Sequence, residues 1–219
     1  MPLAPVHIVR TGTANLASVV AALTRAGVQP ALTSDPAEIE NAKAVILPGV
    51  GSFGAAMEGI RAARIEHVLR DRIIAGRPTL SICLGLQVLF ESSEETPGVP
   101  GLGVVPGIIG RFSGGVRIPQ LGWNRVEADP MCTLLAGGDA YYANSYRAMT
   151  PPPGFSCAWT THGERFIAAM ERGAVLACQF HPELSGRWGA ELIERWLDRA
   201  GVERAASSAG LPGKESAPC

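Results

Sequence analysis

Cys83, His181 and Glu183 are the residues of this chain whose types and spacing could do nucleophilic chemistry. Cys83 lies in "SICLGLQVLF", where an apolar, strand-like run meets a glycine and a helix-like stretch. A strand, a sharp turn and a helix form a nucleophile elbow, which needs small neighbours such as Ser81 and Gly85. The unpaired N–H groups that begin the following helix favour a thiolate and can bind an oxyanion. The segment alone leaves a buried structural cysteine equally open.

A thiol nucleophile requires a base and usually a group that orients the base. His181 ends an apolar strand in "QFHPELSG", and Glu183 follows two positions later. In extended backbone, residues i and i+2 point to the same side, so Glu183 could hold one ring nitrogen while the other faces Cys83. A strand-end histidine beside a surface glutamate is the competing interpretation. Structural or solvated positions are expected for the other three histidines, which are His7, His67 and His162.

A glycine-containing loop, Gly49-Val50-Gly51, follows a predicted strand in "LPGVGSFGAAM". Its glycines allow the backbone to turn N–H groups toward developing negative charge, as an oxyanion hole requires. The loop lacks the Lys-Ser/Thr pair of a P-loop and the full G-x-G-x-x-G context. Nucleotide binding is therefore the poorer interpretation.

The elements that must position these groups follow an α/β pattern through the first ninety residues. Apolar runs bounded by Gly and Pro alternate with helical periodicity, which is typical of a parallel sheet flanked by helices. The predicted strands are residues 6–10, 29–33, 44–48 and 78–82. The predicted helices are a segment through Leu16 and Leu23 that ends at Gly27, one with an Asp35 N-cap, Pro36 and a capping-box Glu38, and one from Ile65 to Ile73 that stops at Gly76.

From about residue 100 the pattern changes to short strands and turns, which we expect to add antiparallel strands to the sheet edge. The candidate strands are residues 107–112, 122–126, 140–146 and 156–161, followed by a hairpin of 165–170 and 174–180. A last helix, about 187–200, places a core-facing stripe on one side, made of Trp188, Leu192, Ile193, Trp196 and Leu197. We predict one α/β domain, residues 1–201, and a flexible tail, 202–219, in which Cys219 has no role.

Composition and charge exclude several classes of function. The chain has 219 residues, 19 of them basic and 20 acidic, so no basic field argues for nucleic acid or an anionic membrane. No signal peptide or membrane-length apolar stretch is visible, which predicts a soluble cytoplasmic protein. The 5 cysteines are widely and irregularly spaced without C-x-x-C, so we expect no disulfide framework, metal site or cofactor.

The glycine loop, the thiol elbow and His-x-Glu, in this order, resemble the class I (triad) glutamine amidotransferases over about residues 5–200. That family typically has G-x-C-x-G-x-Q at the elbow and H-P-E at the base, where this chain has "SICLGLQ" and "HPE". Ser81 replaces the usual glycine, and we expect the turn to survive because serine is small. The segments "PGVGSFGAAM", "IPQLGWNRV" and "YYANSYR" resemble one branch of the family, the glutaminase subunits of imidazole glycerol phosphate synthase.

The resemblance implies a Cys83-His181-Glu183 triad that hydrolyses glutamine to glutamate and ammonia through a thioester. It implies an oxyanion hole made by the N–H of Leu84 and one from the Gly49-Val50-Gly51 loop. It also implies that the glutamine head group is bound by Gln87, Ser145 and Tyr146.

The resemblance further implies a partner on a separate chain, a cyclase with a (β/α)₈ barrel that receives the ammonia within a heterodimer. The cyclase would form imidazole glycerol phosphate and an aminoimidazole carboxamide ribotide. The residues that match partner-facing segments are Asn15, Gln120, Trp123 and Asn124. Core packing is a competing interpretation for Trp123.

Three departures from the relatives bear on the partner contacts and not on the reaction. Relatives often have histidine where Gln120 and Asn144 stand, and a basic residue where Leu184 stands. A different class of function, a non-catalytic or redox-sensing α/β protein with a cysteine elbow, is the alternative hypothesis.

Overall fold

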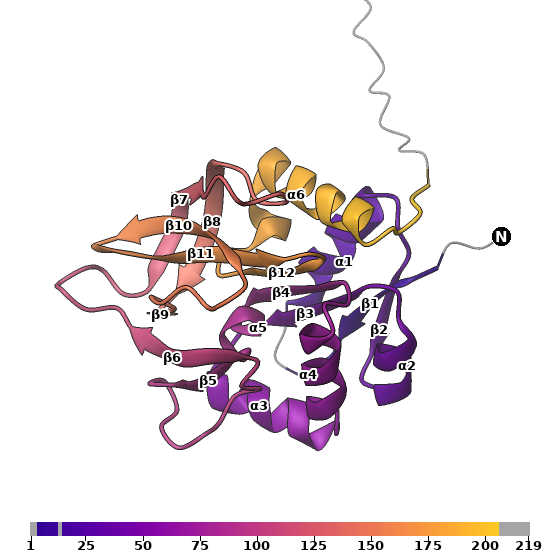
Figure 1. Cartoon of the computed structure of the whole chain (residues 1–219), viewed down its shortest axis with the longest axis horizontal. Coiled ribbons are helices and arrows are strands. Elements are labelled where there is room, and N and C mark those ends of the chain that lie inside the picture. Colours follow the sequence, from indigo (N-terminus) through magenta and orange to yellow (C-terminus); the bar gives the residue numbers. More distant parts are fainter. Residues whose placement is uncertain (1–3, 13–14, 206–219) are drawn as a thin grey trace, which may run out of the picture.

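A mixed sheet of nine strands runs through the protein (Figure 1). The structure, a computed structural model, describes residues 4–12 and 15–205. In spatial order the strands are β2 (Pro30–Thr33), β1 (Val6–Val9), β3 (Val45–Gly49), β4 (Thr79–Cys83), β12 (Val175–Cys178), β11 (Glu164–Arg172), β10 (Ser156–His162), β7 (Gln120–Ala128) and β8 (Gly138–Asn144). The first five are parallel to one another, and the other four are joined by antiparallel pairings.

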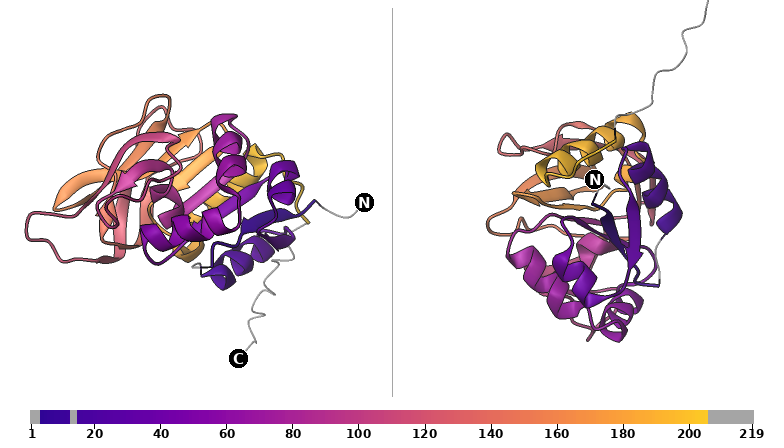
Figure 2. Two further views of the ribbon diagram at one scale, coloured as in Figure 1. Left: turned by 90° about the horizontal axis from the view of Figure 1, so that it is seen from below. Right: turned by 90° about the vertical axis from the view of Figure 1, so that its right-hand side faces the viewer.

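Helices cover both faces of the parallel half, and the antiparallel strands extend away from them (Figures 1 and 2). One face carries α1 (Leu16–Arg25) and α6 (Gly186–Arg199), and the other carries α2 (Pro36–Asn41), α3 (Phe53–Ala62) and α4 (Glu66–Ile74). Two clusters of buried apolar side chains result, because each face of a parallel sheet must be shielded from water. The predicted α/β fold is therefore confirmed.

Before the elbow at Cys83, the chain forms the predicted strands and helices, with one local difference at α2. Asp35 caps that helix as expected, since its Oδ1 accepts a hydrogen bond from the N–H of Ala37 at 2.8 Å. The N–H of Asp35 donates to Thr33 Oγ1 at 3.0 Å, however, so the donor that Glu38 would satisfy in a capping box is already paired.

The second half adds antiparallel strands and the predicted β11–β12 hairpin. One strand prediction needs correction: β6 (Val105–Arg111) does not join the main sheet. It forms a separate three-stranded sheet with β5 (Phe90–Ser93) and β9 (Tyr146–Arg147). On α6 the predicted stripe is buried at Leu192, Ile193, Trp196 and Leu197, while Trp188 packs against the same core only in part.

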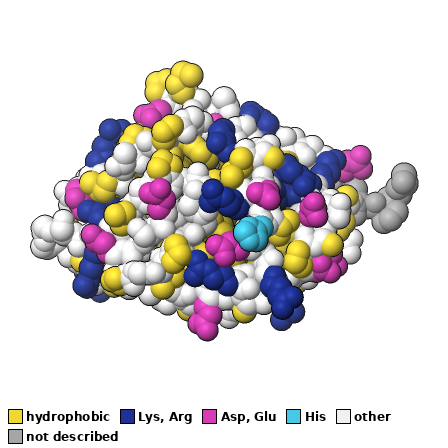
Figure 3. Space-filling model, turned by 60° about the horizontal axis from the view of Figure 1, so that its bottom comes forward, with side chains coloured by type: hydrophobic (Ala, Val, Ile, Leu, Met, Phe, Trp, Pro, Cys, Tyr) yellow, Lys and Arg dark blue, Asp and Glu magenta, His cyan; other side chains and the backbone are white. Residues whose placement is uncertain are grey.

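No helix among the described residues is long and apolar enough to cross a membrane. On the face shown in Figure 3, basic and acidic side chains are interspersed. The first residues of the predicted tail are held against the domain: Val202 is buried, and the N–H of Ala205 donates to the carbonyl of Gly27. Cys219 lies outside the described residues.

Candidate active site

Cys83 occupies a strained elbow between β4 and α5 (Leu84–Gln87), with φ at 55°. A non-glycine residue seldom adopts positive φ, and the surrounding packing must hold it there. Gly85 allows this packing, because a Cβ on Gly85 would lie 2.0 Å from the carbonyl oxygen of Leu47 on β3. Ser81 is buried two residues before the elbow and leaves its hydroxyl without a protein partner. The expectation that the turn survives Ser81 is confirmed.

The helix that follows the elbow is shorter than the sequence indicates. We expected "LGLQVLF" to continue as a helix, but α5 is a single turn and Phe90 already begins β5. The carbonyls of Val88 and Leu89 accept N–H groups from residues 102, 104 and 105, so backbone pairing with that segment replaces further helical bonds. A one-turn helix has only a small dipole, although the N–H of Leu84 still lies in a first turn, where donors have no helical partner.

His181 and Glu183 form the pair that the spacing predicted. Nδ1 of His181 lies 2.9 Å from Oε1 of Glu183, which leaves Nε2 for the hydrogen bond between the ring and Cys83. The prediction of extended backbone at Glu183 was wrong. Glu183 lies in a 3₁₀ turn, η1 (Pro182–Leu184), and its side chain reaches the ring from there. The N–H of His181 donates to Tyr141 at 2.9 Å, which fixes the backbone that carries the ring.

The surroundings of His181 decide its protonation state. Burial by itself lowers the pKa of His181, but the hydrogen bonds to Cys83 and Glu183, and then their negative charges, raise it to about 10 from an ordinary 6.5. The ring therefore keeps its proton at neutral pH. A protonated imidazole held beside a thiol can act as an acid toward a leaving group.

This raised pKa predicts a pH dependence of stability. A group whose pKa is higher in the folded state stabilises the fold fully below its unfolded pKa, and the effect is lost as pH rises. The free energy of unfolding of wild type, relative to a His181→Gln variant, should therefore fall between about pH 6.5 and pH 10. Urea denaturation at several pH values measures this difference. A constant difference across that range would contradict the assigned protonation state.

A pocket of about 230 Å³ opens onto Cys83 and His181. Most of the predicted oxyanion and glutamine-binding residues line it, namely Val50, Gly51, Leu84, Gln87, Ser145 and Tyr146. Gly49 lies beside Cys83 in the β3–β4 register, and Gly51 has φ at 98°. Residues predicted from four separate segments are thus brought together at the carboxyl ends of the parallel strands, where α/β sheets place their ligands.

Two residues in contact with this site were missed by sequence reasoning. Glu95 lines the pocket from a turn-rich stretch, "ESSEETPG", that shows no periodicity. Gln179 is fully buried, and its side-chain Nε2 lies 3.8 Å from Cys83 Sγ. The signal for Gln179 was present in the sequence, since it is a polar residue at the end of an otherwise apolar strand, two positions before His181.

The sequence model of the family "Glutamine amidotransferase class-I" matches residues 8–200. The chain belongs to the class-I glutamine amidotransferases. The amidotransferase is 42% identical over 200 residues (85% of this chain, 94% of the relative) to "Imidazole glycerol phosphate synthase subunit HisH" of Nocardia farcinica. It is 44% identical over 200 residues (87% and 98%) to the protein of the same name from Thermococcus kodakarensis. A solved structure titled "Crystal structure of glutamine amidotransferase" has the same fold, with a TM-score of 0.72 at 24% identity, and 90% of this chain and 99% of that chain are covered.

In this amidotransferase the four residues predicted to face a partner differ in exposure. Trp123 is 60% exposed and packs edge-to-face on Tyr141, so the core-packing interpretation of Trp123 is wrong. Asn124 is exposed and donates to the carbonyl of Thr161 at 2.8 Å. Gln120 is only 4% exposed, which argues against direct contact of its side chain with a partner. Asn15 is exposed and lines a small crevice with Gly49, Val50, His181 and Glu183, close to the triad.

At Gln120 and Asn144, where relatives often have histidine, two amide side chains belong to residues that pair directly across the β7–β8 register. Asn144 Nδ2 donates to the carbonyl of Tyr146, but its Oδ1 and both polar atoms of Gln120 are buried without a protein partner. Leu184, where relatives often have a basic residue, is exposed. Among the described contacts, none of the three makes a side-chain hydrogen bond to Cys83, His181 or Glu183, in keeping with a role outside the chemistry.

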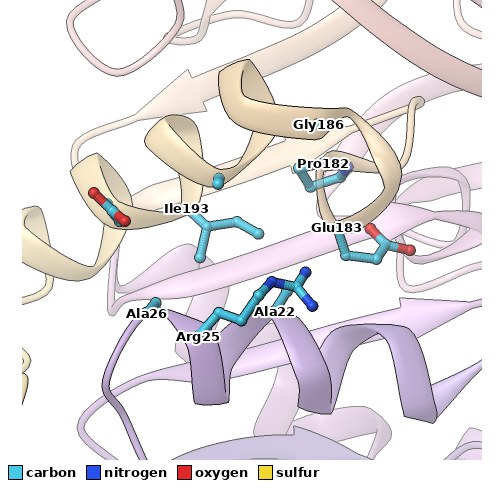
Figure 4. A pocket seen from close by; sticks show the side chains of 9 residues that line it. Ala22, Arg25, Ala26, Pro182, Glu183, Gly186 and Ile193 are labelled. Atoms are coloured by element: carbon cyan, nitrogen blue, oxygen red, sulfur yellow. The ribbon is translucent and has the colours of Figure 1, made fainter. Parts of the chain in front are cut away.

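A second, smaller cavity of about 130 Å³ lies between α1 and α6, behind Glu183 (Figure 4). Arg25 extends from α1 toward the turn that carries Pro182 and Glu183. Cys83 does not line this cavity, so glutamine cannot react there. Within residues 4–12 and 15–205, no group of three or more His, Cys, Asp or Glu is placed to hold a metal ion.

Proposed function

We propose that this amidotransferase is the glutaminase subunit of an imidazole glycerol phosphate synthase. The observation that carries the proposal is a pocket lined by a strained Cys83, by Gln87 and by His181, whose ring is paired with Glu183. Two relatives, 42% and 44% identical and matched over 94% and 98% of their own length, carry this subunit name. The reaction is the hydrolysis of glutamine to glutamate and ammonia.

The catalytic cycle uses His181 first as a protonated acid and then as a neutral base. The thiolate of Cys83 attacks the side-chain amide carbon of glutamine, and the tetrahedral oxyanion accepts N–H groups from Leu84 and from the Gly49-Val50-Gly51 loop. His181 gives its proton to the leaving amine, and ammonia departs to leave a thioester. The neutral ring then takes a proton from water, which attacks the thioester carbonyl and releases glutamate. Glu183 holds the ring in orientation through Nδ1.

The polar atoms of the pocket suit the two charges of the glutamine head group. We place its ammonium group near the carboxylate of Glu95, the acidic side chain that lines the pocket beside the triad residues. Glu95 is itself fixed, because its Oε2 accepts the N–H of Phe53 at the start of α3 at 2.6 Å. Ser145 and Tyr146 also line the pocket, and we place the remaining head-group contacts at their backbone.

A Glu95→Gln variant should raise KM for glutamine about 10- to 100-fold with little change in kcat, because it removes a charge that binds substrate and transition state equally. The amide keeps the size of the side chain and can still accept the N–H of Phe53. Steady-state glutaminase kinetics measure the split. Glu91→Gln is the matched control, since Glu91 also accepts a backbone N–H, from Gly107, but does not line the pocket. An unchanged KM in Glu95→Gln would remove Glu95 from the binding site.

The partner in this proposal is a cyclase on a separate chain, which we expect to be a (β/α)₈ barrel that forms a heterodimer with the amidotransferase. Three exposed apolar side chains support a docking surface next to the triad: Leu121, Trp123 and Leu184. Leu121 and Trp123 alternate along β7, Leu184 directly follows Glu183, and the Trp123 ring lies 3.7 Å from the Cβ position of Gly186. Apolar side chains on a docking surface would exclude water from the interface with the cyclase. A cytoplasmic location also remains part of the proposal.

Mixing the chain with the cyclase tests the proposal directly. Glutamate formation is measured with the amidotransferase alone, with cyclase added, and with cyclase plus its ribulosyl ribotide substrate. We expect turnover to rise when both cyclase and ribotide are present. No glutamine hydrolysis under the complete condition, together with no labelling of Cys83 by a glutamine-mimicking electrophile, would favour the redox-sensing alternative. That alternative explains neither the His181–Glu183 pair nor the acidic side chain in the pocket.

A further inference from the structure

Gln179 occupies a position that the mechanism above does not use. It follows β12 directly and is fully buried, and its N–H donates to the carbonyl of Ala168 at 2.8 Å. A buried primary amide is costly unless its donors and acceptor are paired, so the partners of this side chain are informative.

The partners of Gln179 connect the nucleophile to the pocket wall. Its Nε2 donates to Cys83 Sγ at 3.8 Å, and its Oε1 accepts Nε2 of Gln87 at 3.0 Å. Nε2 of Gln87 also donates to the carbonyl of Tyr146 at 3.1 Å. A chain of hydrogen bonds therefore runs from Tyr146 through Gln87 and Gln179 to the sulfur.

The direction of this chain fixes the orientation of both amides. Gln87 donates its N–H groups inward, to Gln179 and Tyr146, so its carbonyl oxygen is the polar atom left for the pocket. If the Gln179 amide were reversed, two NH₂ groups would face each other and the sulfur would face an oxygen. One orientation is therefore strongly preferred.

We propose that Gln179 is a positioning residue that acts through both neighbours: it supports the thiolate form of Cys83, and it makes Gln87 an acceptor for a donor group of the substrate. This inference rests on the proposed glutaminase function. A hydrogen bond to the charged form of a group favours that form, so an N–H aimed at sulfur favours the thiolate before attack and again when sulfur leaves the thioester. The acceptor at Gln87 suits the ammonium of glutamine, which we place near Glu95 in the same pocket.

Two variants separate the two contacts. Gln179→Met keeps the approximate volume and loses both hydrogen bonds. Gln179→Glu keeps an acceptor for Gln87 but has no donor for the sulfur when ionised. The first readout is the pH midpoint of Cys83 alkylation by iodoacetamide, a small electrophile that needs no glutamine site. The second is KM for glutamine, measured with the partner present.

We expect the alkylation midpoint of Gln179→Met to rise by about one pH unit, and KM for glutamine to rise about tenfold as the Gln87 amide loses its fixed orientation. In Gln179→Glu the midpoint should rise at least as far, while KM stays within about threefold of wild type.

Both variants are made in a Cys219→Ser background. The remaining thiols react slowly at neutral pH, since burial, as the main cause, raises the pKa of Cys132 and Cys157 to about 11 and that of Cys178 well above its usual range.

Cys178→Ala is the control for loosened packing, because Cys178 is the buried neighbour of Gln179 and no described side-chain hydrogen bond links its thiol to Cys83 or Gln87. It should change neither readout, and ammonia-dependent synthesis by the complex confirms that each variant folds and docks. A wild-type midpoint or a wild-type KM in a folded Gln179→Met would overturn the inference. Failure of the wild type to hydrolyse glutamine would count instead against the proposed function, and the alkylation midpoints would still test the contact between Gln179 and Cys83.

Discussion

Replacing Cys83 with alanine should abolish glutamine-dependent synthesis by the complex while synthesis from added ammonia continues. Among the described residues that line the pocket, Cys83 alone supplies a sulfur beside His181, so no residual route retains the thioester step. Loss of a nucleophile that acts together with its base costs about 10⁴-fold or more in kcat. The measurement is the rate of imidazole glycerol phosphate formation by the mixed subunits, with glutamine and then with an ammonium salt as nitrogen source.

The two nitrogen sources separate chemistry from assembly. Cys83 is buried, and the change to alanine removes only the sulfur, so the variant should fold and bind the cyclase. Loss of ammonia-dependent as well as glutamine-dependent synthesis would mean that Cys83 is structural. Retention of both activities would mean that the nucleophile is another residue.

The triad and the strands beneath it could be predicted from sequence because local patterns specify them. Cys83 and His181 each follow an apolar run at the carboxyl end of a parallel strand, and parallel strands bring such ends to one edge. Small residues around Cys83 indicated the elbow. Glycine is required at position 85 because a Cβ there would clash with the carbonyl oxygen of Leu47. These features depend on a few neighbouring residues, which periodicity reports well.

The features that were missed depend on contacts between distant segments. The helix after Cys83 stops after one turn because backbone near residue 102 pairs with Val88 and Leu89, which no local pattern predicts. Glu95 reaches the pocket because its carboxylate caps α3, forty-two positions away at Phe53. The exposure of Trp123 likewise depends on which side of β7 lacks a covering element. Tertiary context overrides propensity in all three cases.

A Gly85→Ala variant should lower glutaminase activity about 100-fold or more, although alanine is the smallest possible addition. The new Cβ would lie 2.0 Å from the carbonyl oxygen of Leu47, closer than any real contact, and that atom belongs to the backbone of a central strand. Either β3 or the elbow must move, and such overpacking costs about 1–3 kcal/mol of stability. A displacement of about 1 Å at the nucleophile is enough to cost two orders of magnitude in rate, because the attack depends on alignment with the bound amide.

Gly137→Ala is the matched control, because a Cβ there would meet its nearest atom, the carbonyl oxygen of Val126, at an ordinary 3.6 Å. Glutaminase kinetics and urea denaturation are measured for both variants, with ammonia-dependent synthesis as the check on docking. Gly137→Ala should match wild type in all three assays. If Gly85→Ala also kept wild-type glutaminase activity, the elbow would tolerate a shift of β3, and the close approach of Gly85 to Leu47 would not be what holds Cys83 in its strained conformation.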